Sequence, residues 1–144
     1  MASVSIYLNF ARETEQAFNF YKSVFGGELG QIMRFSDMPL QEGMSPLPKE
    51  DQNLIMHTDL TITGGHILMG SDAPKSMGFK INIGNNMHIN LQIDTRKEAD
   101  QLFKNLSEEG EVTMPMEDQF WGDYFGSCTD KFGVQWMINC PEKA

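Results

Sequence analysis

The sequence predicts an α+β fold that is built from two similar βαβββ modules. An alternating strand, an amphipathic helix and a final apolar strand each occur twice along the chain. The matched pairs are Ser5–Phe10 with His88–Ile93, Phe20–Val24 with Leu102–Leu106, and Gly65–Ser71 with Gly133–Asn139. A long unit that occurs only twice indicates two modules with pseudo-twofold symmetry and a shared core, rather than an open array of short repeats.

The first module, residues 1–71, is expected to begin with a strand, a helix and a second strand. Polar and apolar residues alternate over Val4–Phe10, which predicts a strand that is covered on one side. Apolar residues then recur at helical spacing over Arg12–Phe25, and the pair Gly26-Gly27 ends this helix. The segment Leu29–Phe35 is expected to form the second strand.

A long loop, Ser36–Asn53, follows, with several prolines and no usable periodicity. Loops of this length in compact domains are often functional lids. Four apolar residues in the loop either close over a pocket or cover the core, and we favour a lid. These residues are Met38, Leu40, Met44 and Leu47.

The remaining segments complete the two modules. A hairpin of Leu54–Thr63 and His66–Ser71 turns at Gly64-Gly65. Residues 72–86, rich in glycine and asparagine, form the expected linker to the second module, residues 87–144. In that module we expect strands at Met87–Ile93, Glu111–Met116, Trp121–Thr129 and Val134–Asn139, with a helix that starts at the capping box Thr95–Glu98 and ends at Gly110.

The composition limits the classes of partner. The net charge is −9, and Lys and Arg are scattered singly, so neither nucleic acid nor a membrane is an expected partner. No apolar run approaches bilayer-spanning length, and we expect a cytoplasmic protein. Cys128 and Cys140 are expected to remain free thiols, because a turn near Lys131 pairs Cys128 with a residue near Gln135.

Several motifs are similar to a known family. They include Ala17–Glu28 at the first helix, Met56–Leu60, Asp118–Gly122 and Thr129–Trp136. Together with the duplicated βαβββ unit, they resemble the vicinal-oxygen-chelate superfamily of glyoxalase I, extradiol dioxygenases and bleomycin-resistance proteins, and within it the PhnB-like branch. The resemblance implies a glyoxalase-like, incompletely closed eight-stranded barrel.

The resemblance also indicates where a metal would be held. Enzymes of this superfamily bind a divalent metal through His and Glu or Gln side chains on the first and last strand of each module. Those positions fall near Ser5, Met69, His88 and Met137, and only His88 is of the usual ligand type. Two thioethers and one imidazole do not suit zinc or harder ions, and methionine is far commoner as a core residue than as a copper ligand. We therefore expect no metal.

No other cofactor is expected either. Some members of the branch carry a demethylubiquinone methyltransferase label. The chain shows no glycine-rich loop after a strand, with an acidic residue downstream, that would hold an adenosyl cofactor. A basic or glycine-rich cradle for phosphate is also missing from the sequence.

Six residues are candidates for a ligand pocket: Tyr7, His57, His88, Asn90, Trp121 and Tyr124. His88 either acts as a base or hydrogen-bond donor, or is satisfied by Asn90 or backbone. His57 stands two residues before Asp59, so a carboxylate could orient it as a base. Trp121 and Tyr124 either stack on a ligand or fill the core.

The function expected from these observations is a metal-free, homodimeric protein that binds a small organic molecule. The alternative is a metal-dependent lyase, isomerase or dioxygenase that uses His88 with donors such as His57 or Glu117. A purely structural or partner-binding dimer is a third possibility. Homodimerisation is expected because an incompletely closed barrel leaves strand edges and an apolar rim that need cover.

Overall fold

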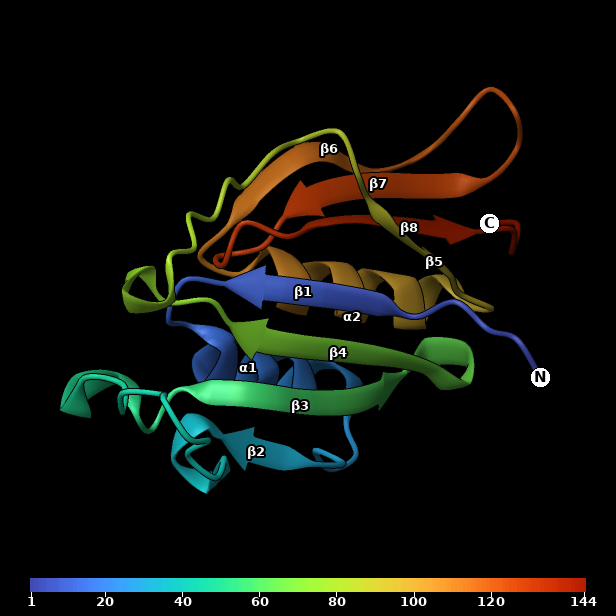
Figure 1. Ribbon diagram of the computed structural model, residues 1–144. Coiled ribbons are helices and arrows are strands. Elements are labelled where there is room, and N and C mark those ends of the chain that lie inside the picture. The colour runs from blue at the N-terminus through green and yellow to red at the C-terminus, as the bar shows by residue number, and fades with distance from the viewer. The chain divides into compact units, whose positions relative to one another are not determined.

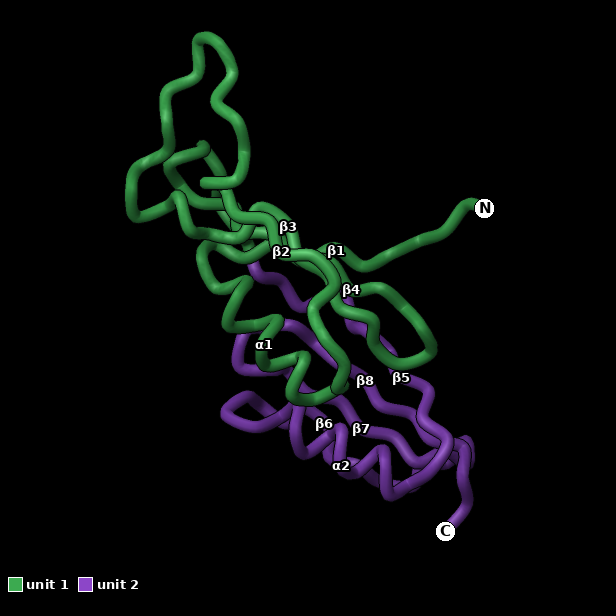
Figure 2. The backbone as a smooth tube through the Cα atoms, turned by 90° about the horizontal axis from the view of Figure 1, so that it is seen from below, with its two compact units in different colours: residues 1–82 green, residues 83–144 purple.

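The computed structural model describes residues 1–144, which divide into two compact units. Unit 1 comprises Met1–Asn82 and unit 2 comprises Ile83–Ala144, so the boundary falls within residues 72–86, where the sequence predicts a linker (Figure 2). Each unit holds one four-stranded sheet and one α-helix. None of the helices is long and apolar enough to cross a membrane.

Unit 1 has the order strand, helix and three strands, as the sequence predicts (Figure 1). Its last strand lies in the sheet between the first and the third, in the order β1-β4-β3-β2. β1 and β4 run parallel, and the other neighbours run antiparallel. The elements are β1 (Ile6–Phe10), α1 (Thr14–Phe25), β2 (Ile32–Arg34), β3 (Ile55–Ile62) and β4 (His66–Asp72).

The core of unit 1 lies between α1 and one face of the sheet. Phe18 on α1 is fully buried, and Gly70 on β4 leaves room for its ring, because a Cβ atom on Gly70 would overlap Phe18. The buried carboxylate of Asp72 accepts hydrogen bonds from the backbone N–H of Thr14, at 3.0 Å, and of Ile55, at 2.9 Å. Asp72 thus connects the start of α1 to the start of β3.

Unit 2 repeats this arrangement with the strand order β5-β8-β7-β6. Thr95 caps its helix, since the Thr95 hydroxyl accepts a hydrogen bond from the Glu98 N–H at 3.2 Å. The repeat found in the sequence is also present in the strand register. Tyr7 on β1 pairs with Met69 on β4, and the equivalent residue Asn90 on β5 pairs with Met137 on β8. The elements are β5 (Ile89–Gln92), α2 (Arg96–Ser107), β6 (Glu111–Asp118), β7 (Tyr124–Thr129) and β8 (Gln135–Cys140).

Several strands are shorter than the sequence predicts, and β2 and β7 show why. β2 has only three residues, because its register with β3 shifts after Met33 and a 3₁₀ turn, Phe35–Asp37, follows directly. β7 begins at Tyr124 instead of Trp121, because a turn in which the Gly122 N–H donates to the Gln119 carbonyl at 2.9 Å delays it. The prediction of two βαβββ modules in an α+β fold is nevertheless confirmed.

The two cysteines are free, as predicted, and both are buried. Cys128 pairs across the hairpin with Trp136, and Cys140 pairs with Tyr124, so the two thiols do not face each other. Burial raises the pKa of the Cys128 thiol to about 12, with a smaller contribution from the charge of Asp130. A thiol held in its protonated form is a poor nucleophile, so Cys128 is suited to a core position.

Candidate functional site

The face of the first sheet that α1 leaves open carries a cluster of polar side chains. On β1, Tyr7 and Asn9 are exposed, whereas Phe10 is buried, which confirms the predicted alternation. On β3, His57 and Asp59 are half-buried and alternate with buried residues on the helix side. Strand alternation therefore brings β1 and β3 side chains to one surface, across the intervening β4.

Three of these side chains form a connected cluster, which we call the Tyr7–His57–Asp59 cluster. The Tyr7 hydroxyl lies 3.1 Å from Nδ1 of His57, and the ring centroids are 5.7 Å apart with planes tilted by 44°. Nε2 of His57 lies 3.7 Å from the Oδ2 atom of Asp59. The sequence predicts the His57–Asp59 proximity, but the Tyr7 contact emerges only from the strand order.

Gly30 gives the Asp59 side chain its space. The Gly30 N–H donates to the Asp59 carbonyl at 2.9 Å, which brings the two backbones close together. A Cβ atom on Gly30 would overlap the Asp59 carboxylate. A glycine at this position therefore allows the carboxylate to point toward His57, a requirement that sequence periodicity does not reveal.

The cluster defines the chemistry that this face offers. When the Tyr7 hydroxyl donates to Nδ1, neutral His57 carries its proton on Nε2, the nitrogen that faces Asp59. Both ring nitrogens of this imidazole then face a polar group, Nδ1 the Tyr7 hydroxyl and Nε2 the Asp59 carboxylate. This fixes the orientation of the ring, as a group that binds or accepts a proton requires. Tyr7 is 45% exposed, so its hydroxyl oxygen remains within reach of a ligand.

In unit 2, the candidates His88 and Asn90 lie on the open side of the second sheet. His88 is exposed and precedes β5, while Asn90 and Gln92 alternate with the buried Leu91, as predicted. The Asn90 amide donates to the Gln92 side chain at 3.4 Å, a long hydrogen bond, and not to His88. The open side of the second sheet therefore has no histidine that is oriented as His57 is in unit 1.

Trp121 stands at the tip of the hairpin between β6 and β7. It is 51% exposed and packs edge-on against Phe120 and Phe125, with ring centroids 5.2 Å and 5.8 Å away. An exposed aromatic group of this kind is suited to contact with a partner or ligand rather than to a core position.

Tyr124 lies on the side of the second sheet that α2 covers, away from Asn90. Its hydroxyl donates to the Asp100 carboxylate at 2.6 Å, and the Arg96 guanidinium lies 4.3 Å from its ring centroid. The hydrogen bond to Asp100 raises the pKa of Tyr124 to about 12, with burial as the second cause. Its hydroxyl and ring are thus engaged by α2, a placement different from the pocket position expected for it.

The residues at the family's metal positions do not fit a divalent ion. In unit 1 they are Ser5 and Met69, and in unit 2 they are His88 and Met137, so only one nitrogen donor is present among them. No group of three or more His, Cys, Asp or Glu side chains is placed to hold a metal ion, and Glu117, the other donor considered, belongs to no such group. We therefore derive no chemical step through a metal.

Sequence reasoning missed two structural features. His66, beside its glycine turn, is half-buried, and its Nε2 accepts a hydrogen bond from the Ile6 N–H at 3.2 Å. Asp51, in the long loop, is buried and bound by Arg12 and Ser76. The only sequence signal for Asp51 was its place in a loop without periodicity, which does not indicate a buried carboxylate.

Comparisons with known proteins agree with this architecture. A family model described as the Glyoxalase/Bleomycin resistance protein/Dioxygenase superfamily matches residues 6–138. Protein YjdN of Escherichia coli is 32% identical over 143 residues, which cover 94% of this chain and 93% of that protein.

Solved structures extend the likeness to three dimensions. Protein PA1353 of Pseudomonas aeruginosa is 35% identical, with a TM-score of 0.82 over the full length of both chains. The PhnB protein of Bacillus cereus shares the fold at 24% identity, with a TM-score of 0.76 over 96% of this chain and 99% of that one. The predicted PhnB-like likeness is thus confirmed at the level of the fold. With the paired βαβββ modules and the family match over nearly the whole chain, the chain belongs to the Glyoxalase/Bleomycin resistance protein/Dioxygenase superfamily.

Proposed function

We propose that this protein binds a small organic molecule, without a metal ion, on the open face of its first sheet. The observation that carries the proposal is the Tyr7–His57–Asp59 cluster. It places a hydroxyl, an oriented imidazole and a carboxylate on one accessible surface. A few convergent polar groups of this kind fix the orientation of a bound ligand.

The surroundings of the cluster suggest the kind of molecule. The half-buried thioether Met69 pairs with Tyr7 in the register of β1 and β4. The Ser71 hydroxyl donates to the Asn9 side chain at 3.2 Å, so further polar groups lie on the same face. A ligand with an apolar body and one or two hydrogen-bonding groups would satisfy both kinds of surface.

The metal-dependent alternative is not favoured by the placement of donors. Any such site would need His88 to be joined by other nitrogen or oxygen ligands, and the structure places no such group. Metal analysis of the purified protein tests this part directly. Stoichiometric Zn, Ni, Mn or Fe that is retained after dialysis would contradict metal-free binding.

The ligand-binding part is tested by a thermal-shift screen of neutral and acidic metabolites, because a ligand that binds only the folded state raises the unfolding temperature. Tyr7→Phe should weaken binding of any acidic hit at least about tenfold, since one hydrogen bond to a charged or oriented partner contributes about 1.4 kcal/mol or more. Tyr124→Phe is the matched control, because it removes a hydroxyl on the helix side of the second sheet. Equal binding by both variants would contradict the assignment of the site.

A further inference from the structure

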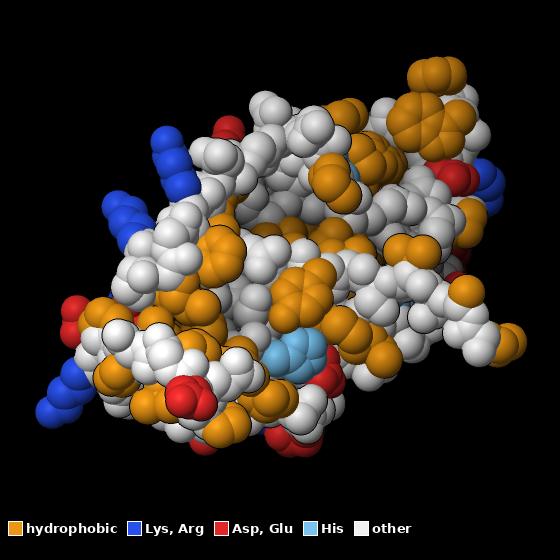
Figure 3. Space-filling model, viewed as in Figure 1, with side chains coloured by type: hydrophobic (Ala, Val, Ile, Leu, Met, Phe, Trp, Pro, Cys, Tyr) orange, Lys and Arg blue, Asp and Glu red, His pale blue; other side chains and the backbone are white.

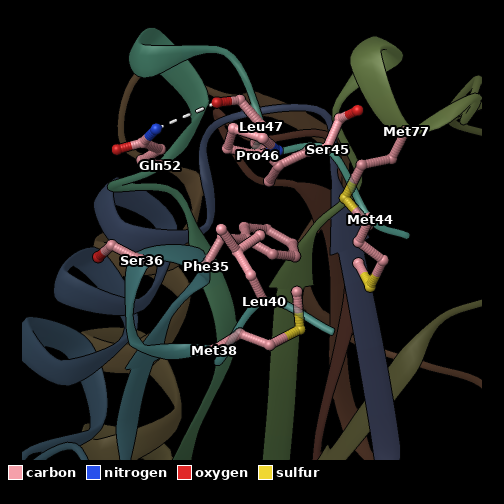
Figure 4. Close-up of a pocket in the computed structure, with 10 residues that line it drawn as sticks. All are labelled: Phe35, Ser36, Met38, Leu40, Met44, Ser45, Pro46, Leu47, Gln52 and Met77. Carbon is pink, nitrogen blue, oxygen red and sulfur yellow. Dashed lines mark hydrogen bonds between the residues drawn. The ribbon is translucent and has the colours of Figure 1, made fainter. Parts of the chain in front are cut away.

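We propose that unit 1 contains a second, separate binding site, a methionine-lined pocket that takes one small neutral aromatic molecule. The pocket lies beneath the loop that follows β2, where hydrophobic side chains gather at the lower left of the molecule (Figure 3). None of the residues of the Tyr7–His57–Asp59 cluster lines it. The side chains that enclose it are mainly Phe35, Met38, Leu40, Met44, Leu47 and Met77 (Figure 4).

The pocket is formed by a loop whose course is fixed by hydrogen bonds. The Phe35 N–H donates to the Leu54 carbonyl at 3.1 Å, and the Ser36 N–H donates to the Gln52 carbonyl at 2.8 Å. Across the pocket rim, the Gln52 side-chain amide donates to the Leu47 carbonyl at 3.1 Å. These bonds join the two ends of the loop to each other just before β3 begins, so the pocket exists before a ligand arrives.

A buried carboxylate joins the loop to the opposite wall. Asp51 accepts a hydrogen bond from the Ser76 hydroxyl at 2.5 Å, and its other oxygen is bound by the Arg12 guanidinium. Ser76 is the neighbour of Met77, in the short 3₁₀ turn Lys75–Met77. Asp51 therefore holds the Met77 wall in position relative to the loop.

The size and lining of the pocket define the ligand. Its volume is about 200 Å³, somewhat larger than the cavities of about 150 Å³ that take benzene in engineered proteins. Methionine sulfur makes favourable contacts with aromatic rings, and three methionines line this pocket.

The polarity of the lining sets the charge of that ligand. No charged side chain lines the pocket, so an ionic ligand would find no counter-charge. Ser36, Ser45 and Gln52 are the polar residues in the lining, and all three are uncharged. A bicyclic aromatic alcohol matches this combination of size, aromaticity and neutral polarity.

The probe that tests the proposal is 1-naphthol, titrated into protein labelled with ¹³C at its methionine methyl groups. Ring currents of bound naphthol should shift the methyl signals of Met38, Met44 and Met77. The signals of Met69 and Met137, which lie on the sheet faces, should not move. Shifts confined to Met69 or Met137, or no shifts at all, would overturn the proposal.

Matched variants locate the site independently. Met44→Lys places a charge in the pocket lining and should weaken naphthol binding at least tenfold. Phe79→Lys makes the same change at an exposed apolar residue that does not line the pocket, and it should bind as the wild type does. Equal loss of binding in both variants would overturn the proposal.

Two further comparisons separate this pocket from the site on the open sheet face. Tyr7→Phe should bind naphthol normally, so a loss there would overturn the second site while leaving the first intact. Naphthalene-1-sulfonate, which carries the same rings with a negative charge, should bind at least tenfold more weakly than 1-naphthol. Equal affinity for both compounds would show that the pocket does not select neutral molecules.

Discussion

The Tyr7 hydroxyl lies 3.1 Å from Nδ1 of His57, although fifty residues separate the two in the chain. With the Tyr7 hydroxyl as the donor in this contact, neutral His57 carries its proton on Nε2, which faces Asp59. His66 provides an internal comparison, because its Nε2 accepts the Ile6 N–H and its proton must lie on Nδ1. Long-range ¹⁵N NMR should therefore show opposite tautomers for the two histidines. The same tautomer in both would show that Nδ1 of His57 donates to the Tyr7 oxygen instead.

Asp51 should make stability depend on pH in the acid range. Hydrogen bonds from Ser76 and then from Arg12 lower the pKa of this carboxyl below its ordinary value of 3.8. The ionised form is therefore favoured by folding, and its contribution is present above pH 3.8 and lost as pH falls through the lower, folded pKa. Asp51→Asn should be less stable than wild type in urea at pH 7. The difference should shrink below about pH 4; a constant difference would contradict this account.

Tyr124 should make stability depend on pH in the alkaline range, with the opposite sign. Its pKa is raised from 10.0 to about 12, so folding favours the protonated hydroxyl. That contribution is complete below pH 10 and is lost as pH rises toward 12. Absorbance titration should show that one of the three tyrosines ionises at a higher pH than the other two. Asp100→Asn should lower the pKa of Tyr124 toward 10. Tyr124→Phe should cost only about 0.5–1 kcal/mol, because the bond is exposed to solvent.

Leu91 on β5 and His88, which directly precedes that strand, should respond very differently to substitution. Leu91 is 4% exposed and faces α2, so Leu91→Ala should cost about 2–5 kcal/mol, and Leu91→Asp should unfold the protein. His88→Ala should leave stability within about 0.5 kcal/mol of wild type, because the side chain is exposed. Circular dichroism during urea unfolding measures both. An unfolded His88→Ala protein would show that the faces of the strand are assigned backwards.

We also expect the protein to be a homodimer. β6 is an edge strand of the second sheet, and its residues Val112 and Met114 are 48% and 43% exposed. Apolar side chains on an open strand edge favour association with another chain. Light scattering at micromolar concentration should give twice the mass of the chain, and Met114→Lys should shift it toward the monomer. A monomeric wild-type protein would contradict the expectation.

Much of the fold followed from local pattern because the two modules repeat it. The alternation around Leu91 and the capping box at Thr95 depend on neighbours in the chain, and both are present as predicted. The Tyr7–His57 contact was not predictable in this way, because it depends on β4 being inserted between their strands. Local pattern determines the face on which a side chain lies, whereas strand order determines what lies beside it.

Turns and loops account for the remaining errors. The turn at Gly122 moved the start of β7 by three residues, and pattern alone did not show that Tyr124 faces α2. In the long loop, the course of the chain depends on hydrogen bonds such as that from Ser36 to Gln52 and on the buried carboxylate of Asp51. Such contacts leave no periodic signal, so the sequence raised the possibility of a pocket under the loop but did not reveal the hydrogen bonds that shape it.

The insertion of β4 between β1 and β3, repeated by β8 between β5 and β7, determines the order in which the protein can assemble during synthesis. In each sheet the last strand to leave the ribosome, β4 or β8, makes the two central pairings, so these pairings form last. Until then, β1 or β5 has no neighbour, and the nascent chain keeps unpaired strand edges that chaperones recognise. A chain that stops before β8 (Gln135–Cys140) would consequently lose a central strand of the second sheet and not an edge.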